Sequence, residues 1–228
     1  MMLNPHTPVG YPKVIHFLHI GKTGGTALKY ALRVTTDPSV TFHLHNHDTK
    51  LRDVPAGEHV FFFVRDPIRR FVSAFYSRQR EGRPRYFRPL TEAEKESFAR
   101  FHTANELASA LSAPDERTRQ HAEDAMRSIH HIKDSYWMWF ESEAYFRSRL
   151  DDIFFIGFQE SLAEDFLALK SRLPLPTGAA LPDDDTLAHR NPTHLDTTLT
   201  AAAYENVTRW YEADYAFVSL CRQLRSSR

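Results

Sequence analysis

The sequence of 228 residues has little cysteine, no excess charge of either sign and no long apolar run. Its one cysteine, Cys221, excludes an intramolecular disulfide and any metal site built from several cysteines, which favours a reducing compartment. Lysine plus arginine number 29, as do aspartate plus glutamate, so no overall field attracts nucleic acid or an anionic membrane. Any anion that the protein binds must therefore be held by a local group of donors.

Segments that direct a chain to or through a membrane are also lacking. No stretch approaches the roughly 20 apolar residues of a membrane span. The first residues, MMLNPHTPVGYPK, lack the basic flank and continuous apolar core of a signal peptide. We therefore expect a cytoplasmic protein without an integral membrane segment. Its length favours a single domain over residues 1–228, and the sequence contains no internal repeat.

Three apolar runs rich in β-branched or aromatic residues predict buried strands, and each leads through a loop into a helical pattern. They are VIHFLHI (14–20), HVFFFV (59–64) and IFFIGF (153–158), with a shorter strand expected over 40–44. Parallel strands require crossover connections, and helices then cover both faces. The sequence therefore predicts an α/β protein with a three-layer, P-loop-like fold, in which helices flank a central, mostly parallel sheet.

Capping patterns predict where several helices begin. They are Asp66 before Pro67, Thr91 with Glu94, Thr103 with Glu106, and Ser161 with Glu164. One or two helices are expected between residues 115 and 149, a long loop over 173–196, and a final helix over about 200–220.

The loop GKTGGT follows the first strand and opens the first helix. Its glycines let the backbone approach a ligand, and the amides at the start of the helix favour an anion such as phosphate or sulfate. Lysine adds a positive charge and the threonines add hydroxyl donors. We expect a cofactor to bind here through Gly21, Lys22, Thr23, Gly24, Gly25, Thr26 and Ala27. The alternative is an ordinary glycine turn with a solvated lysine.

A second candidate anchor is VRDPIRRFVSAFYSR, where Arg65 leaves a strand end and Ser73 follows eight residues later on a helix. The guanidinium fork and the hydroxyl together suit one terminal phosphate. The alternative is an arginine bonded to local carbonyls and a serine packed in a helix. The first loop is no Walker A motif, because its lysine precedes the glycine pair, and this disfavours a magnesium-dependent NTPase.

Together the two motifs resemble those of sulfotransferases that use 3′-phosphoadenosine 5′-phosphosulfate (PAPS), in the carbohydrate branch similar to uronyl and heparan sulfate 2-O-sulfotransferases. In that family a loop of the form PKTGGT binds the 5′-phosphosulfate, and an RDP segment with a downstream serine binds the 3′-phosphate. Here Gly21 stands where proline is usual. The resemblance implies PAPS as donor, its bisphosphate PAP as product, and no metal requirement.

The resemblance extends to IFFIGFQESLAEDF and to HRNPTHLD with the final helix. By analogy with the family, Arg190 and Asn191 are expected to close over the nucleotide. The alternative is a solvated polar loop.

Sulfuryl transfer to an alcohol also needs a base, and FHLHNHD offers His43, His45 and His47. In an extended segment all three rings share one face, so a metal site is one interpretation and hydrogen-bonded surface histidines are another. In the 2-O-sulfotransferase branch an HxH motif supplies the base. The resemblance therefore favours His47 as the base, with His45 as the second candidate. His43 is the alternative if the motif is aligned in a shifted register.

Two groups of residues are candidates for contact with an acceptor. Arginines that could bind an acidic sugar chain, or simply be solvated, are Arg78, Arg80, Arg83, Arg85 and Arg88, with Tyr86 and Phe87 among them. Aromatic residues that could line a cleft, but at helical spacing are more typical of a core, are Tyr136, Trp137, Trp139 and Phe140.

The sequence thus predicts an enzyme that transfers a sulfuryl group from PAPS to a hydroxyl acceptor, expected to be a saccharide, by in-line displacement. A P-loop-like nucleotide kinase and a nucleotide- or polyanion-binding module without turnover are the alternatives.

Overall fold

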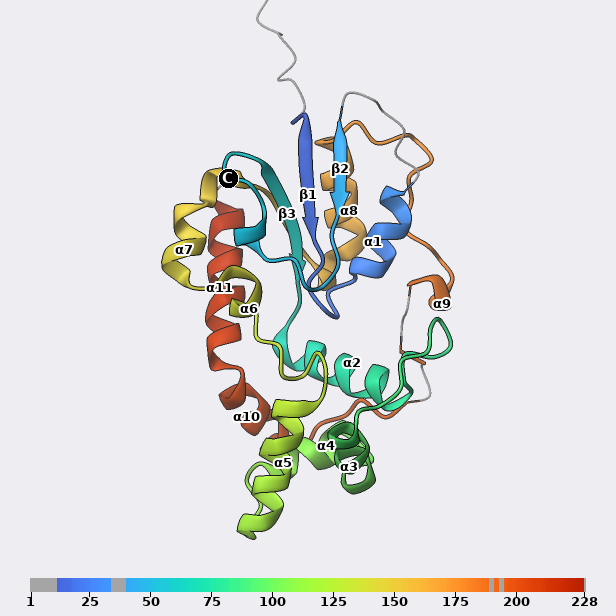
Figure 1. Ribbon diagram of the computed structural model, residues 1–228, viewed down its shortest axis with the longest axis vertical. Helices are drawn as coiled ribbons and strands as arrows, with labels where there is room; N and C mark the ends of the chain where they lie inside the picture. The colour runs from blue at the N-terminus through green and yellow to red at the C-terminus, as the bar shows by residue number, and fades with distance from the viewer. Residues whose placement is uncertain (1–11, 34–39, 189–190, 193–194, 228) are drawn as a thin grey trace, which may run out of the picture.

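The computed structural model describes residues 12–33, 40–188, 191–192 and 195–227. Its centre is a four-stranded sheet with the order β2-β1-β3-β4, in which every pair of neighbouring strands is parallel (Figure 1). The strands are β1 (Val14–Leu18), β2 (Thr41–Leu44), β3 (His59–Val64) and β4 (Ile153–Phe158). Helices flank this sheet, which confirms the predicted three-layer α/β fold.

Successive residues of β3 are buried on opposite faces of the sheet. Phe61 packs in the cluster that includes α1 (Gly25–Leu32) and α8 (Leu162–Ser171). Phe62 packs in the cluster on the other face, where its ring contacts Phe140 and Phe217. Because both faces are covered, the strand is apolar at nearly every position, as expected for a parallel sheet.

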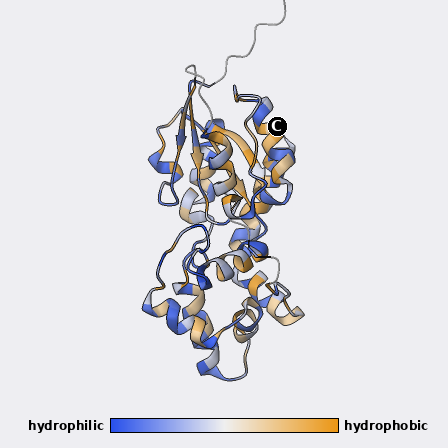
Figure 2. Ribbon diagram, turned by 90° about the vertical axis from the view of Figure 1, so that its right-hand side faces the viewer, coloured by the Kyte–Doolittle hydropathy of each residue, from blue (hydrophilic) through white to orange (hydrophobic). Residues whose placement is uncertain are grey.

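The second face is covered by α6 (Trp137–Phe140), α7 (Glu143–Ser148) and α11 (Glu212–Ser226). A further helical group lies beyond the carboxyl ends of the strands and has a core of its own (Figure 1). It contains α2 (Pro67–Gln79), α3 (Glu92–Arg100), α4 (Ala104–Ala110), α5 (Glu116–Ser128) and α10 (Ala201–Trp210). Figure 2 shows hydrophobic residues along the strands and alternating hydrophobic and hydrophilic stripes on these helices.

Most helix starts lie where the capping patterns placed them. The Asp66 side chain accepts from the Arg69 amide at 2.9 Å, and both threonine capping boxes are present. Ser161 differs, because its hydroxyl donates to Asp165 at 2.9 Å instead of capping α8. The predicted final helix is divided at Tyr211 into α10 and α11.

The remaining elements are short. The segment between 115 and 149 forms three helices rather than one or two. The long loop contains α9 (Asp185–Ala188). Three 3-10 turns complete the description: η1 (Leu51–Asp53), η2 (Leu150–Asp152) and η3 (Gln159–Ser161).

Within the described ranges, none of the helices has both the length and the apolar character needed to cross a membrane.

Candidate active site

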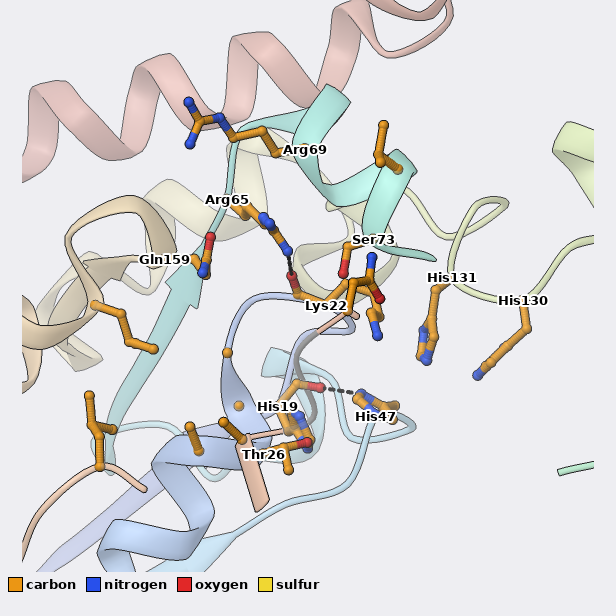
Figure 3. A pocket seen from close by; sticks show the side chains of 18 of the residues that line it. His19, Lys22, Thr26, His47, Arg65, Arg69, Ser73, His130, His131 and Gln159 are labelled. Atoms are coloured by element: carbon orange, nitrogen blue, oxygen red, sulfur yellow. Dashed lines mark hydrogen bonds between the residues drawn. The ribbon is translucent and has the colours of Figure 1, made fainter. Parts of the chain in front are cut away.

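A cavity of about 830 Å³ opens where β1 and β3 end and α1 and α2 begin. Such crevices at the carboxyl ends of parallel strands are the usual ligand sites of α/β sheets. The expected site residues that line it are Lys22, Gly24, Gly25, Thr26, Ala27, His47, Arg65, Ser73 and Asn191. Figure 3 shows Arg65 and Ser73 pointing toward Lys22, with His47 and His131 on the far side of the lysine.

The glycine loop bends sharply between β1 and α1. Lys22 has a φ of 68° and Gly24 a φ of 87°, so two left-handed residues lie within three positions. A lysine in this region is strained, and strain of this kind gathers at functional sites. The Thr23 hydroxyl donates to the Ile20 carbonyl at 3.0 Å and the residue is fully buried, so this hydroxyl holds the loop rather than facing the cavity.

The cavity is built for negative charge. Burial, with Arg80 and Arg65 nearby, lowers the pKa of Lys22 to about 7. The Nε atom of Arg65 is buried and has no hydrogen-bond partner among the described residues. No aspartate or glutamate of the described part lines the cavity. Cations gathered without a carboxylate fit an anionic ligand, which would supply the missing partners.

Arg65 is fixed by contacts on both sides. Its Nη1 atom donates to the Lys22 carbonyl at 3.3 Å, and its backbone amide donates to the Tyr136 hydroxyl at 2.8 Å. The same hydroxyl donates to the Arg65 carbonyl at 2.7 Å. Ser73 and Arg69 line the cavity from α2, four residues apart and therefore on one helix face.

His47 lines the cavity and is held by two hydrogen bonds, one of which uses a nitrogen of its ring. Its Nδ1 atom donates to the His19 carbonyl at 2.8 Å, and its own carbonyl accepts from Trp139 Nε1 at 2.8 Å. A carbonyl only accepts, so Nδ1 carries the proton and the lone pair of the neutral ring lies on Nε2. Burial lowers the pKa of His47, which favours this neutral form.

His43 and His45 lie elsewhere. The His45 Nε2 atom is 2.8 Å from His16 Nδ1, and the other nitrogen of His16 is 2.7 Å from Glu58. The His43 ring stacks on His16 with centroids 4.7 Å apart. The three histidines of the FHLHNHD segment therefore do not converge on one point, and of the three only His47 lines the cavity.

The loop expected to close over the nucleotide is described in part. Asn191 lines the cavity, and its side-chain oxygen accepts from Arg80 Nη1 at 2.7 Å. Arg190 lies outside the described residues.

The arginine-rich segment does not act as one group. Arg78 is buried and binds both carboxylate oxygens of Glu94, at 2.8 and 2.7 Å. Arg85 donates to backbone carbonyls of α9, and Arg83 lies over the Phe87 ring. Arg88 lines the cavity, and so does the neighbouring Tyr86.

The aromatic group belongs to the core. Tyr136, Trp139 and Phe140 are fully buried in the cluster behind the sheet, and none of them lines the cavity. The alternative interpretation as an acceptor cleft is not supported by this placement.

Several cavity residues were not expected from the sequence. Arg69 could have been found, since it precedes Ser73 by one helical turn. His130 and His131 gave no signal, because tertiary packing alone brings the segment after α5 to the glycine loop. An ideal Cβ on Gly21 would lie 2.4 Å from Nδ1 of His131, so that imidazole occupies the space of a side chain at residue 21.

One of three comparisons with known proteins finds a match. No curated protein and no solved structure matches the chain detectably. A protein-family model described as "Sulfotransferase family" matches residues 6–217, which include the glycine loop, Arg65, Ser73 and His47. With most of its length matched, the chain belongs to the sulfotransferase family.

Proposed function

We propose that the protein transfers a sulfuryl group from PAPS to a hydroxyl of an acidic saccharide. The observation that carries this proposal is the contact between its two anion anchors. Arg65 donates to the Lys22 carbonyl in a cavity that gathers cations and, among the described residues, has no acidic lining. A nucleotide with phosphates at both ends suits two cationic anchors that are adjacent but distinct.

The proposed donor is held at both ends. Arg65 and Ser73 bind its 3′-phosphate, through the guanidinium fork and the hydroxyl. Lys22 and the amides of the glycine loop bind the 5′-phosphosulfate at the start of α1. Asn191 lines the cavity, and we propose that it covers the nucleotide together with Arg190, which lies outside the described residues.

The donor supplies an activated sulfuryl group, whose sulfur bonds to the acceptor oxygen while the bond from sulfur to the phosphate oxygen breaks. His47 Nε2 takes the proton of the acceptor hydroxyl, because Nδ1 is already engaged by the His19 carbonyl. Lys22 stabilises the negative charge that develops on the leaving phosphate oxygen. The bisphosphate leaves, and no metal ion is required for this transfer.

The acceptor end is proposed from the cavity wall. Arg88 and Tyr86 both line it, so a cation and an aromatic ring are available. A carboxylated sugar ring suits this pair, because arginine binds carboxylates through two parallel bonds and aromatic rings stack on sugar faces. The reaction is proposed to take place in the cytoplasm.

A transfer assay with labelled PAPS tests the proposal. The purified protein is incubated with the donor and a uronic-acid oligosaccharide, a neutral oligosaccharide or a simple alcohol. We expect labelled sulfate on the uronic-acid acceptor, with less transfer to it by an Arg88→Ala variant. More transfer to the neutral oligosaccharide than to the uronic-acid oligosaccharide would overturn the proposed acceptor class. Hydrolysis of ATP without any sulfuryl transfer would overturn the proposed reaction.

A further inference from the structure

Three side chains that can ligate a metal lie together in the segment that follows α5. They are His130, His131 and Asp134, and their potential ligand atoms all lie within 4.8 Å of one another. His131 and Asp134 are buried, whereas His130 is partly exposed. Both histidines line the cavity, so an ion can reach them from solvent (Figure 3).

The distances within this cluster suit a shared ion better than hydrogen bonds. One carboxylate oxygen of Asp134 is 3.5 Å from Nδ1 of His131 and 3.9 Å from Nδ1 of His130. Hydrogen bonds from nitrogen to oxygen span about 2.7–3.2 Å. Two ligands on one tetrahedral zinc ion, each about 2.0–2.1 Å from it, lie roughly 3.4 Å apart. The distance from Asp134 to His131 matches this spacing, and the distance from Asp134 to His130 is somewhat longer.

One ring nitrogen of His131, Nδ1, is buried without a hydrogen bond among the described residues. Buried polar atoms are nearly always paired, so an orphan of this kind indicates a missing ligand. Asp134 is already oriented, since the same carboxylate accepts from the His131 amide at 3.2 Å.

The His131 ring packs directly against Gly21. An ideal Cβ at that position would lie 2.4 Å from Nδ1 of His131 and 2.9 Å from its Cε1 atom. A side chain at residue 21 would therefore overlap the imidazole. The absence of a side chain at residue 21 thus allows the imidazole to lie in the cavity wall beside the glycine loop.

We propose that His130, His131 and Asp134 form a binding site for one divalent transition-metal ion of the zinc class. Two imidazoles and one carboxylate favour zinc, cobalt or nickel over magnesium and calcium, which prefer oxygen ligands. Three protein ligands leave a fourth position for water. The site lies in the cavity wall beside His47, whose ring centroid is 4.9 Å from that of His131. It goes beyond the proposed transfer and does not depend on it.

Titration of the purified full chain, first dialysed against a chelator, tests the site. Cobalt(II) gives visible absorption bands that report a tetrahedral site, and zinc binding is followed by calorimetry. We expect one ion per chain in the wild-type protein. We expect an affinity at least tenfold lower in Asp134→Asn and in His130→Ala, the latter altering a partly exposed side chain.

The matched control is the double variant His43→Ala and His45→Ala, which removes the other histidine cluster next to His16. It should bind cobalt as the wild type does. Absence of binding by the wild-type protein would overturn the proposal, and so would loss of binding in the double variant with retention in Asp134→Asn. Calorimetry with PAP on the same samples measures nucleotide binding independently of metal binding. Asp134→Asn should lose affinity for the metal and still bind the nucleotide.

Discussion

Arg65 donates a hydrogen bond of 3.3 Å to the carbonyl of Lys22, a residue 43 positions earlier in the chain. The contact joins the ends of β1 and β3, which are neighbours in the sheet. Tyr136 holds Arg65 from the other side through two backbone hydrogen bonds. The two proposed anion anchors are therefore joined by a hydrogen bond before a ligand arrives, which lowers the cost of ordering them on binding.

Arg65→Ala should weaken binding of PAP. The variant loses a charge-assisted pair worth about 1.5–3 kcal/mol, which corresponds to roughly 10- to 150-fold in Kd. Calorimetric titration measures the change. Arg83→Ala is the control, because that side chain lies over Phe87 and does not line the cavity. Equal affinity for Arg65→Ala and Arg83→Ala would argue against the proposed phosphate contact.

His47→Ala should slow transfer by roughly 10²- to 10⁴-fold, because general-base catalysis supplies that much. Its affinity for PAP should stay close to that of the wild type. His45→Ala is the matched variant, since its ring bonds to His16 outside the cavity, and it should slow transfer far less. The assignment of the base fails if the two variants have equal rates.

Trp139→Phe should reduce the turnover rate without a comparable change in KM. The substitution removes the donor to the His47 carbonyl and leaves the buried ring volume largely filled. We expect the free energy of unfolding to fall by about 1 kcal/mol. Trp137→Phe, on the same helix with its ring packed edge-on against Phe217, is the control. Identical turnover by the two variants would show that the bond does not position His47.

Gly21→Ala should destabilise the protein by about 1–3 kcal/mol through overlap with His131, whose atoms are the three nearest to an added Cβ. The backbone of Gly21 has no positive φ, so the strain is steric. Adding His131→Ala should therefore remove most of the penalty. Chemical denaturation of the two single variants and the double variant measures the coupling, and additive losses would refute the steric explanation.

Binding of PAP should take up protons near pH 8. The pKa of Lys22 is about 7 in the ligand-free protein, so at pH 8 its amine is mostly neutral. A bound anion favours the charged form and raises the pKa, so the complex gains up to about one proton from solution. Calorimetry in buffers of different ionisation enthalpy detects this uptake. The uptake should disappear in Lys22→Met. Release of protons by the wild-type protein on binding would contradict the predicted direction of proton exchange.

The sheet and the positions of the two proposed anion anchors could be predicted from the sequence because strand runs, capping residues and the glycine loop are local signals. Arg65 and Ser73 lie where the pattern of β3 and α2 placed them. The burial of Arg78 could not be foreseen, because its partner Glu94 comes from another helix.

The histidine side of the cavity also depends on long-range packing. His131 reaches Gly21 from a segment about 110 residues further along the chain, and no periodicity marks that contact. The expectation that the three rings of FHLHNHD share one face holds only if the whole segment is extended. β2 ends at Leu44, and the chain then turns His47 away from His43 and His45.

Calorimetric binding of PAP and of ATP to the wild-type protein, each with and without magnesium, tests the central claim most directly. The proposed site predicts preferential binding of PAP that does not depend on magnesium, because Lys22 and Arg65 provide the anchors for both of its phosphates. Preferential, magnesium-dependent binding of ATP would contradict the account and favour a kinase, and binding of neither nucleotide would contradict a PAPS site.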